Sequence, residues 1–141
     1  MKVLILHGPN LNLIGKISSN IGKTLTLDKI NSNIKKHAKK YDVELKIFQT
    51  HKVFQAINFI QRNRNWSNNL IFAPMAWALY EFSILEAISI CKSNCTQLIF
   101  NDKYKSFDKD KSIFTSLSTN NVIGSPEEIY VKALDLIIAQ N

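Results

Sequence analysis

The sequence predicts a doubly wound α/β fold, in which helices cover both faces of a five-stranded parallel sheet. Short aliphatic and β-branched segments alternate with longer segments whose apolar residues recur every three or four positions. Short connections between such β-α units require right-handed crossovers, which place a layer of helices on each side of the sheet. The length of 141 residues suits a single domain, 1–141, with one substantial core.

Five segments are expected to form the strands. Four of them are short and mostly aliphatic or β-branched, which is typical of parallel strands buried on both faces. These four are residues 3–6, 43–48, 70–73 and 97–100, and residues 121–123 are a weaker fifth candidate.

Four helices are expected between and after these strands, each with an apolar face that packs on the sheet. The first has Leu27, Ile30, Ile34 and Ala38 on that face, the second Val53, Ile57 and Ile60, and the third Trp77, Ile84, Ile88 and Cys91. The last begins with a capping Ser125, Pro126 at the first helical position and Glu128 closing a capping box, and it buries Ile129, Ala133, Leu136 and Ile137.

Composition and segment lengths exclude several classes of protein. No apolar run approaches the eighteen residues of a membrane helix, and the run after Met1 and Lys2 is too short for a signal peptide, so we expect a cytoplasmic protein. Cys91 and Cys95 have no neighbouring histidine pair, so neither a disulfide framework nor a metal site is expected.

The net charge of +7 raises the question of a nucleic-acid partner. The lysines form one group at Lys35, Lys36, Lys39 and Lys40 and another within residues 103–111. The first group falls on the outer face of a predicted helix, and the second alternates with Asp108 and Asp110. We therefore interpret both groups as solvated surface and do not expect nucleic acid as a partner.

The most specific motif follows the first predicted strand, at the end of a sheet where doubly wound folds bind ligands. Residues 7–15 read HGPNLNLIG and resemble the opening motif of type II 3-dehydroquinate dehydratases, N/H-G-P-N-L-N-L-L-G. Residues 47–50, IFQT, and 73–77, APMAW, are similar to the ends of that family's second and third strands at matching spacings. The resemblance covers nearly the whole chain and implies a flavodoxin-like three-layer fold.

The resemblance also implies a reaction. Family members eliminate water from 3-dehydroquinate, a small polyol acid, to give 3-dehydroshikimate in the shikimate pathway, without a metal or other cofactor. Such an elimination needs a base, stabilisation of an enolate and an acid. In the family a tyrosine beside an arginine is the base, an asparagine helps to hold a water at the enolate, and a histidine is the acid. Members assemble as trimers, commonly stacked into dodecamers, which implies self-association.

Most of these side chains are absent from this chain. The family's base loop, G-x-R-E-x-x-x-Y-G, corresponds to residues 15–23, where Ile17 takes the arginine position and Gly22 or Ile21, depending on the alignment, takes the tyrosine position. Ala73 replaces the site asparagine, and Leu79 replaces a histidine that binds substrate. Ile99 replaces the histidine that acts as the acid, and Ser106 replaces an arginine that the family commonly has further along the chain. Of the usual polar set, Asn12 alone is retained.

These replacements predict an inactive or strongly impaired site, because an aliphatic side chain has no group that titrates. We expect the apolar side chains of Ile17, Trp77, Leu79 and Ile99 to fill the former cavity, or else to line a dry cleft.

Three functions from different classes stay open. The first is a catalytically silent dehydroquinase-like protein with a regulatory or assembly role. The second is an active dehydratase whose acid and base have moved to His51, Tyr80 or Tyr104, near the ends of the second, third and fourth strands. The third is a small-ligand or nucleic-acid binder on the same fold. The first is favoured because the base and acid positions carry no proton-transfer group.

Overall fold

The computed structural model describes residues 1–141, apart from the side chain of Asp102. Its centre is a parallel sheet in the order β2-β1-β3-β4-β5. The strands are β1 (Lys2–His7), β2 (Glu44–Gln49), β3 (Asn69–Ala73), β4 (Asn94–Phe100) and β5 (Asn120–Gly124). The predicted fold class is confirmed, including the weaker fifth strand, although β4 begins earlier than expected.

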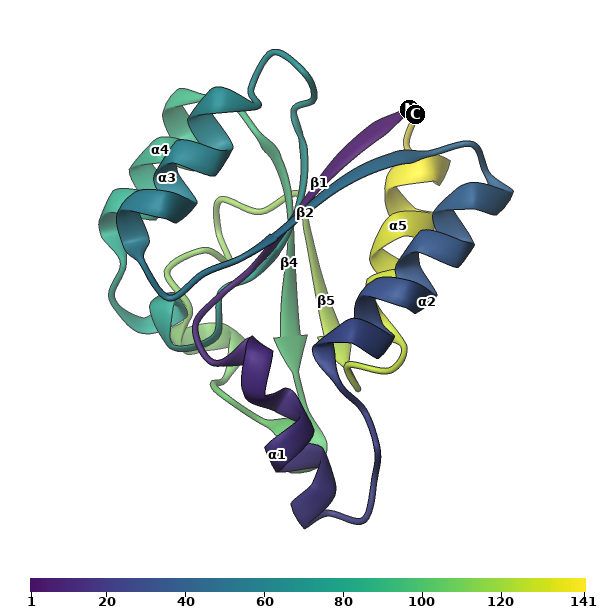
Figure 1. Cartoon of the computed structure of the whole chain (residues 1–141). Helices are drawn as coiled ribbons and strands as arrows, with labels where there is room; N and C mark the ends of the chain where they lie inside the picture. The colour runs from purple at the N-terminus through teal and green to yellow at the C-terminus, as the bar shows by residue number, and fades with distance from the viewer.

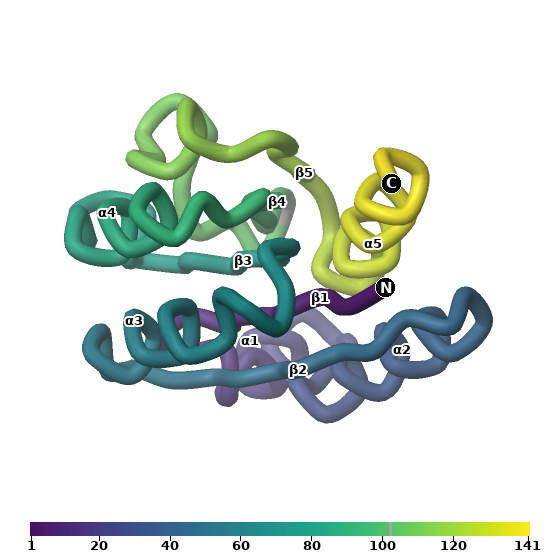
Figure 2. The backbone as a smooth tube through the Cα atoms, turned by 90° about the horizontal axis from the view of Figure 1, so that it is seen from above, coloured from purple at the N-terminus to yellow at the C-terminus, as the bar shows by residue number. Residues whose placement is uncertain are grey.

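Helices cover both faces of this sheet, as Figures 1 and 2 show. One face carries α2 (Leu27–Lys40) and α5 (Ile129–Ala139), and the other carries α3 (Val53–Arg62) and α4 (Phe82–Ile90). A short helix, α1 (Ile14–Asn20), lies beyond the carboxyl ends of the strands. Single 3-10 turns are η1 (Leu11–Leu13), η2 (Met75–Leu79), η3 (Asp102–Tyr104) and η4 (Lys109–Lys111).

Each face of the sheet has its own apolar core, because successive side chains of a strand point to opposite faces. On β1, Val3 and Ile5 belong to the core under α2 and α5. Leu4 and Leu6 belong to the core under α3 and α4. The strand is therefore buried on both sides, which explains why its sequence is continuously apolar rather than alternating.

The third predicted helix is divided in two. Trp77 belongs to η2, and α4 begins at Phe82. Tyr80 adopts φ −157° and Glu81 adopts ψ 75°, and neither angle is helical, so the backbone cannot continue as one helix between them. Trp77 is nevertheless buried, in the core under α3 and α4, close to Phe72.

The start of α5 also differs from the prediction. The helix begins at Ile129, after a turn in which the carbonyl of Ser125 accepts the N–H groups of Glu128 and Ile129. The hydroxyl of Ser125 binds Glu127, and Glu128 pairs with Lys132 at 3.4 Å, so the predicted capping box is not formed.

The prediction of which α5 residues are buried is wrong at one position. Leu136 is 39% exposed, whereas Leu134 and Tyr130 are buried. The inward face is centred on Ala133 and Ile137 and is rotated away from Leu136.

Candidate functional site

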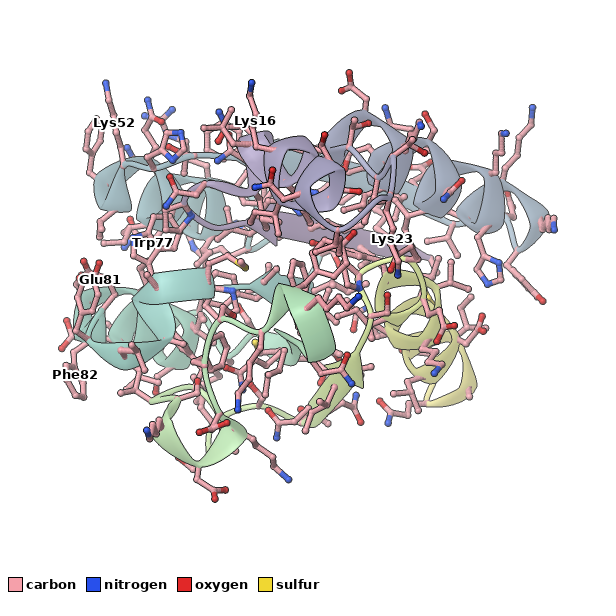
Figure 3. All side chains as sticks on the ribbon, turned by 90° about the horizontal axis from the view of Figure 1, so that it is seen from below. Lys16, Lys23, Lys52, Trp77, Glu81 and Phe82 are labelled. Carbon is pink, nitrogen blue, oxygen red and sulfur yellow. The ribbon has the colours of Figure 1, made fainter. Side chains whose placement is uncertain are left out.

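The carboxyl ends of the five strands meet at one edge of the sheet, which is the lower edge in Figure 1 and is seen from below in Figure 3. The order of the strands reverses between β1 and β3, the point at which open α/β sheets bind ligands. The connections that follow β1, β3 and β4 therefore form the candidate site.

The connection after β1 keeps the shape that its motif predicts. Gly8 lies so close to the end of β3 that a Cβ atom would stand 2.5 Å from the carbonyl oxygen of Pro74. Asn10 adopts the left-handed conformation, with φ 69°, and its N–H donates to Nδ1 of His51 at 3.1 Å. These contacts join the connections after β1, β2 and β3 into one surface.

His7, at the end of β1, forms a buried polar network that the sequence analysis did not single out. Its Nδ1 is 2.9 Å from the hydroxyl of Tyr130, and its Nε2 is 2.9 Å from Oδ1 of Asn31. The amide oxygen can only accept, so Nε2 carries the proton and Nδ1 accepts from the Tyr130 hydroxyl. Burial disfavours the charged ring and lowers the pKa of His7 from 6.5 to about 4.

The sequence signal for this network is His7 at the end of the otherwise apolar strand β1, together with Tyr130 on α5. Burial also raises the pKa of Tyr130 far above its usual range. Both side chains are therefore neutral at pH 7, and they join β1 to α2 and α5.

Asn12, the one site residue that the family resemblance retains, is exposed in the middle of η1, and its side chain has no hydrogen bond to a described residue. Such a side chain offers an amide to solvent, but no proton that can be transferred at neutral pH.

The segment that corresponds to the base loop contains a helix, which corrects the expectation of a loop throughout residues 15–23. Ser18 on α1 is buried, and its hydroxyl accepts the N–H of Leu25 at 2.7 Å. Ile17 is 42% exposed, so it does not fill the former cavity.

The two alternative base positions follow α1. Ile21 is half-buried and packs against the core under α2 and α5. Gly22 adopts φ 73° and has open space where a side chain would stand. Whichever alignment is correct, no acid or base occupies the position.

On the other side of the site, the position that the family resemblance assigns to the acid carries a buried aliphatic side chain. Ala73 ends β3 and Ile99 lies near the end of β4, and both are buried. Trp77 is buried as well and agrees with the expectation of a filled cavity, whereas Ile99 lines a cavity at the end of β4. Leu79 is 48% exposed on η2 and lines a cavity, which agrees with the alternative that these side chains line a cleft.

The three substitute residues lie in three different connections. His51 contacts the backbone of Asn10 at the edge next to β2. Tyr80 is 56% exposed, in the break between η2 and α4. Tyr104 is buried, and its hydroxyl donates to Glu127 at 3.4 Å.

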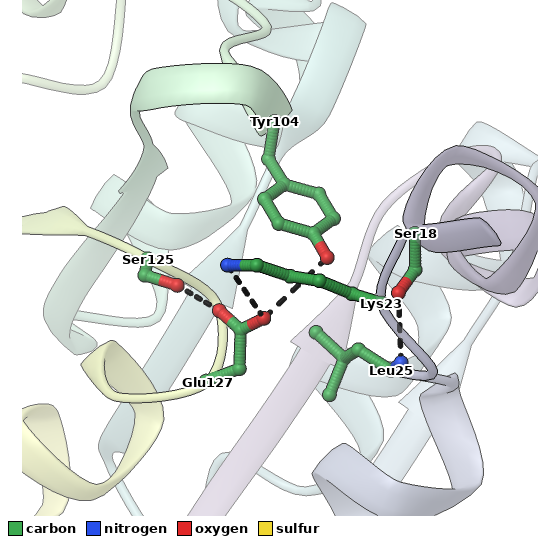
Figure 4. A network of polar contacts seen from close by, with 6 residues as sticks. All are labelled: Ser18, Lys23, Leu25, Tyr104, Ser125 and Glu127. Atoms are coloured by element: carbon green, nitrogen blue, oxygen red, sulfur yellow. Dashed lines mark hydrogen bonds and ion pairs between the residues drawn. The ribbon is translucent and has the colours of Figure 1, made fainter. Parts of the chain in front are cut away.

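Tyr104 belongs to a contact network that joins three connections (Figure 4). Nζ of Lys23 lies 3.6 Å from Oε1 of Glu127 and 5.8 Å from the centre of the Tyr104 ring. Ser125 contacts the other oxygen of the same carboxylate. The segment after α1 is thereby attached to η3 and to the turn before α5.

Among the described residues, no three histidine, cysteine or acidic side chains are grouped closely enough to hold a metal ion. Within the same part of the chain, no helix is both long enough and apolar enough to cross a membrane. Cys95 is buried on β4, and burial raises the pKa of its thiol to about 11.

The fold and this edge define a doubly wound α/β protein whose candidate site has the backbone of a ligand-binding edge but few groups that exchange protons. The chain belongs to the class II dehydroquinase family, whose sequence model, described as "Dehydroquinase class II", matches residues 1–138.

Curated relatives match over almost the whole chain. The 3-dehydroquinate dehydratase of Dictyoglomus turgidum is 30% identical over 138 residues, which cover 97% of this chain and 95% of that protein. The enzyme of the same name from Halothermothrix orenii is 28% identical over 138 residues, with 97% and 93% covered.

Solved structures support the fold. The type II dehydroquinase of Butyrivibrio crossotus superimposes with a TM-score of 0.83 at 19% identity and covers 98% of this chain and 97% of that one. A 3-dehydroquinate dehydratase-like protein from Bifidobacterium longum gives 0.67 at 15% identity, with 99% and 96% covered.

Proposed function

We propose that this chain is a dehydroquinase-like protein that does not dehydrate 3-dehydroquinate, the step that its family performs in the shikimate pathway. The observation that carries the proposal is the character of the site positions. Ile17 stands at the arginine position, Ile99 at the acid position, and Ile21 or Gly22 at the base position. A base and an acid each contribute roughly 10²–10⁴-fold to such a reaction, so losing both removes nearly all of the rate.

The remaining titratable groups are badly placed to replace them. His51 follows β2 and Tyr104 follows β4, and these strands are separated by β1 and β3. Three strand spacings correspond to about 14 Å. His51 already accepts the N–H of Asn10. Tyr104 is buried, and its hydroxyl is bound to Glu127. A relocated mechanism needs an acid and a base that both contact the substrate.

His7 does not supply the missing acid either. Both of its ring nitrogens are engaged, with Tyr130 and with Asn31, and the ring is fully buried. With a pKa of about 4 it carries no proton to donate from an imidazolium at neutral pH.

The test is the ultraviolet absorbance of the conjugated enone that forms when 3-dehydroquinate loses water. The purified protein is mixed with 3-dehydroquinate, and the dehydratase of Dictyoglomus turgidum is assayed beside it under the same conditions. We expect no absorbance change above that of buffer.

A triple variant, His51→Gln, Tyr80→Phe and Tyr104→Phe, is purified in the same way as a matched control for contaminating host enzyme. A small rate that is equal in both preparations belongs to a contaminant and agrees with the proposal. A rate that the triple variant lacks would overturn it and establish an active dehydratase with relocated groups.

A further inference from the structure

Two adjoining cavities lie at the carboxyl end of β4. One, of about 300 Å³, is lined by Leu79, Lys105, Ser106, Phe107, Asp108 and Lys111. The other, of about 310 Å³, is lined by Ile99, Phe100, Asn101, Lys105, Phe107, Asp108, Lys109 and Ile123. They share Lys105, Phe107 and Asp108, so the segment around Phe107 separates two parts of one hollow.

This hollow collects positions that the family uses for chemistry. Leu79, Ser106 and Ile99 stand where the family carries two histidines and an arginine, and all three line it. Larger cavities lie elsewhere, beside Phe48 and Phe54, around Lys29 and Lys36, and along α4, but none of them is lined by such a position.

The walls of the hollow are apolar and partly uncovered. Phe107 and Ile99 are buried and form its floor. Leu79 and Ile123, one at each side, are 48% and 47% exposed. Large apolar side chains that remain open to water around a hollow are typical of a binding site, because covering them is favourable.

The rim of the hollow is positive. Lys105, Lys109 and Lys111 line it against Asp108, which leaves a formal charge of +2 among the lining residues. Asp108 pairs with Lys105 at 2.7 Å and with Lys111 at 4.0 Å, and Lys105 lowers the pKa of that carboxyl. Lys109 forms no ion pair with a described residue. The charge therefore favours an anion.

We propose that this hollow binds a small carboxylate with an apolar ring or branched body, in place of the hydroxylated acid that the family binds. The apolar body would lie against Phe107 and Ile123 in the second cavity, and the carboxylate would face Lys109, which lines the same cavity. Hydroxyl groups on the same ring would be buried against these walls without hydrogen-bond partners, which disfavours their binding. The proposal rests on the proposed function, because it assumes that the elimination chemistry is absent.

The experiment compares ligands that share one carbon skeleton. Cyclohexanecarboxylate, quinate and the neutral cyclohexylmethanol are titrated separately into the protein, and the backbone amide signals are followed by two-dimensional NMR. Cyclohexanecarboxylate is expected to shift the amides of residues 99–111 with a dissociation constant on the order of millimolar, as befits a ligand of this size. Quinate and cyclohexylmethanol are expected to bind at least about tenfold more weakly, since one loses the apolar contact and the other the charge.

Variants locate the site. Lys109→Gln and Ile123→Asn both change exposed side chains that line the second cavity, so the fold is retained, and each is expected to weaken the binding of cyclohexanecarboxylate several-fold. Lys39→Gln on the outer face of α2 is the matched control and is expected to leave binding unchanged.

Three results would overturn the proposal: quinate binding as tightly as cyclohexanecarboxylate, amide shifts that map to another cavity, or no saturable shift at tens of millimolar ligand. Each of these can occur in a protein without dehydratase activity. Conversely, enone formation in the absorbance assay would reject the proposed function whatever the NMR titration shows. The two failures are therefore distinguishable.

Discussion

His7 shows how one side chain links the motif to the stability of the fold. Its neutral ring is held between Tyr130 and Asn31, so α2 and α5 are both attached to the end of β1. Protonation would force a charge into a site that has no anion beside it. The position thus contributes to the architecture, although it lies at the edge where a ligand is expected.

The free energy of unfolding should therefore fall as the solution becomes acidic. The pKa of His7 is about 4 in the folded protein and 6.5 in the unfolded chain, so below pH 6.5 the unfolded chain binds more protons. Stability is retained above pH 6.5 and is lost as the pH falls towards 4, by about 2 kcal/mol between pH 7 and pH 5. Urea denaturation at several pH values measures this loss.

His7→Asn is the control, because the family accepts asparagine at this position and an amide does not titrate in this range. The variant should show a flatter dependence of stability on pH, even if its stability at pH 7 is lower. An equally steep dependence in the variant would assign the effect to other groups.

Among the elements, the strands and the main helices follow from the sequence because burial on both faces makes β1 and β3 continuously apolar. The predicted helix boundaries are wrong where the backbone dihedral angles, rather than the apolar spacing, determine where a helix begins or ends. The break at Tyr80 and the late start of α5 depend on local φ and ψ angles that leave the apolar spacing unchanged, so periodicity cannot reveal them. The sequence does not predict helix α1, because residues 14–20 carry two serines and a glycine, which disfavour helix.

The close approach of Gly8 to β3 explains why the motif after β1 tolerates so little change in shape. In Gly8→Ala, the new methyl group would meet backbone atoms of Ala73 and Pro74 at 2.5–2.8 Å, and a backbone cannot move aside as a flexible side chain does. We expect the free energy of unfolding to fall by at least about 2 kcal/mol.

Gly15→Ala is the matched control for this prediction. Its methyl group would lie 3.4 Å from the side chain of Thr26, and alanine favours helix α1, so stability should be unchanged or rise by up to about 1 kcal/mol. Chemical denaturation of both variants tests the pair. Equal losses in the two would mean that the close approach is not what constrains Gly8.

Across the whole molecule, the cores remain intact while the catalytic positions have changed. The large apolar residues of β1, β3 and the inner faces of the helices are buried, whereas the positions that the family resemblance assigns to catalysis carry no charged side chains. The sequence therefore predicts the fold and the absence of family groups. It could not predict the hollow at Phe107, because residues 101–118 have no periodicity and are placed by contacts such as that of Ser112 with Gln97.

The net charge of +7 gives a last prediction for the molecule as a whole. Lys35, Lys36, Lys39 and Lys40 are exposed on α2, where the nearest acidic residue of the helix, Asp28, lies almost two turns away from them. Such a surface attracts the phosphates of DNA without reading a sequence, and each contact releases counterions. Fluorescence anisotropy should show weak binding to two unrelated duplexes at about 20 mM salt, equal for both, and its loss near about 0.15 M salt. Binding that persists at the higher salt, or that distinguishes the duplexes, would identify a nucleic-acid site and contradict the interpretation of these lysines as solvated surface.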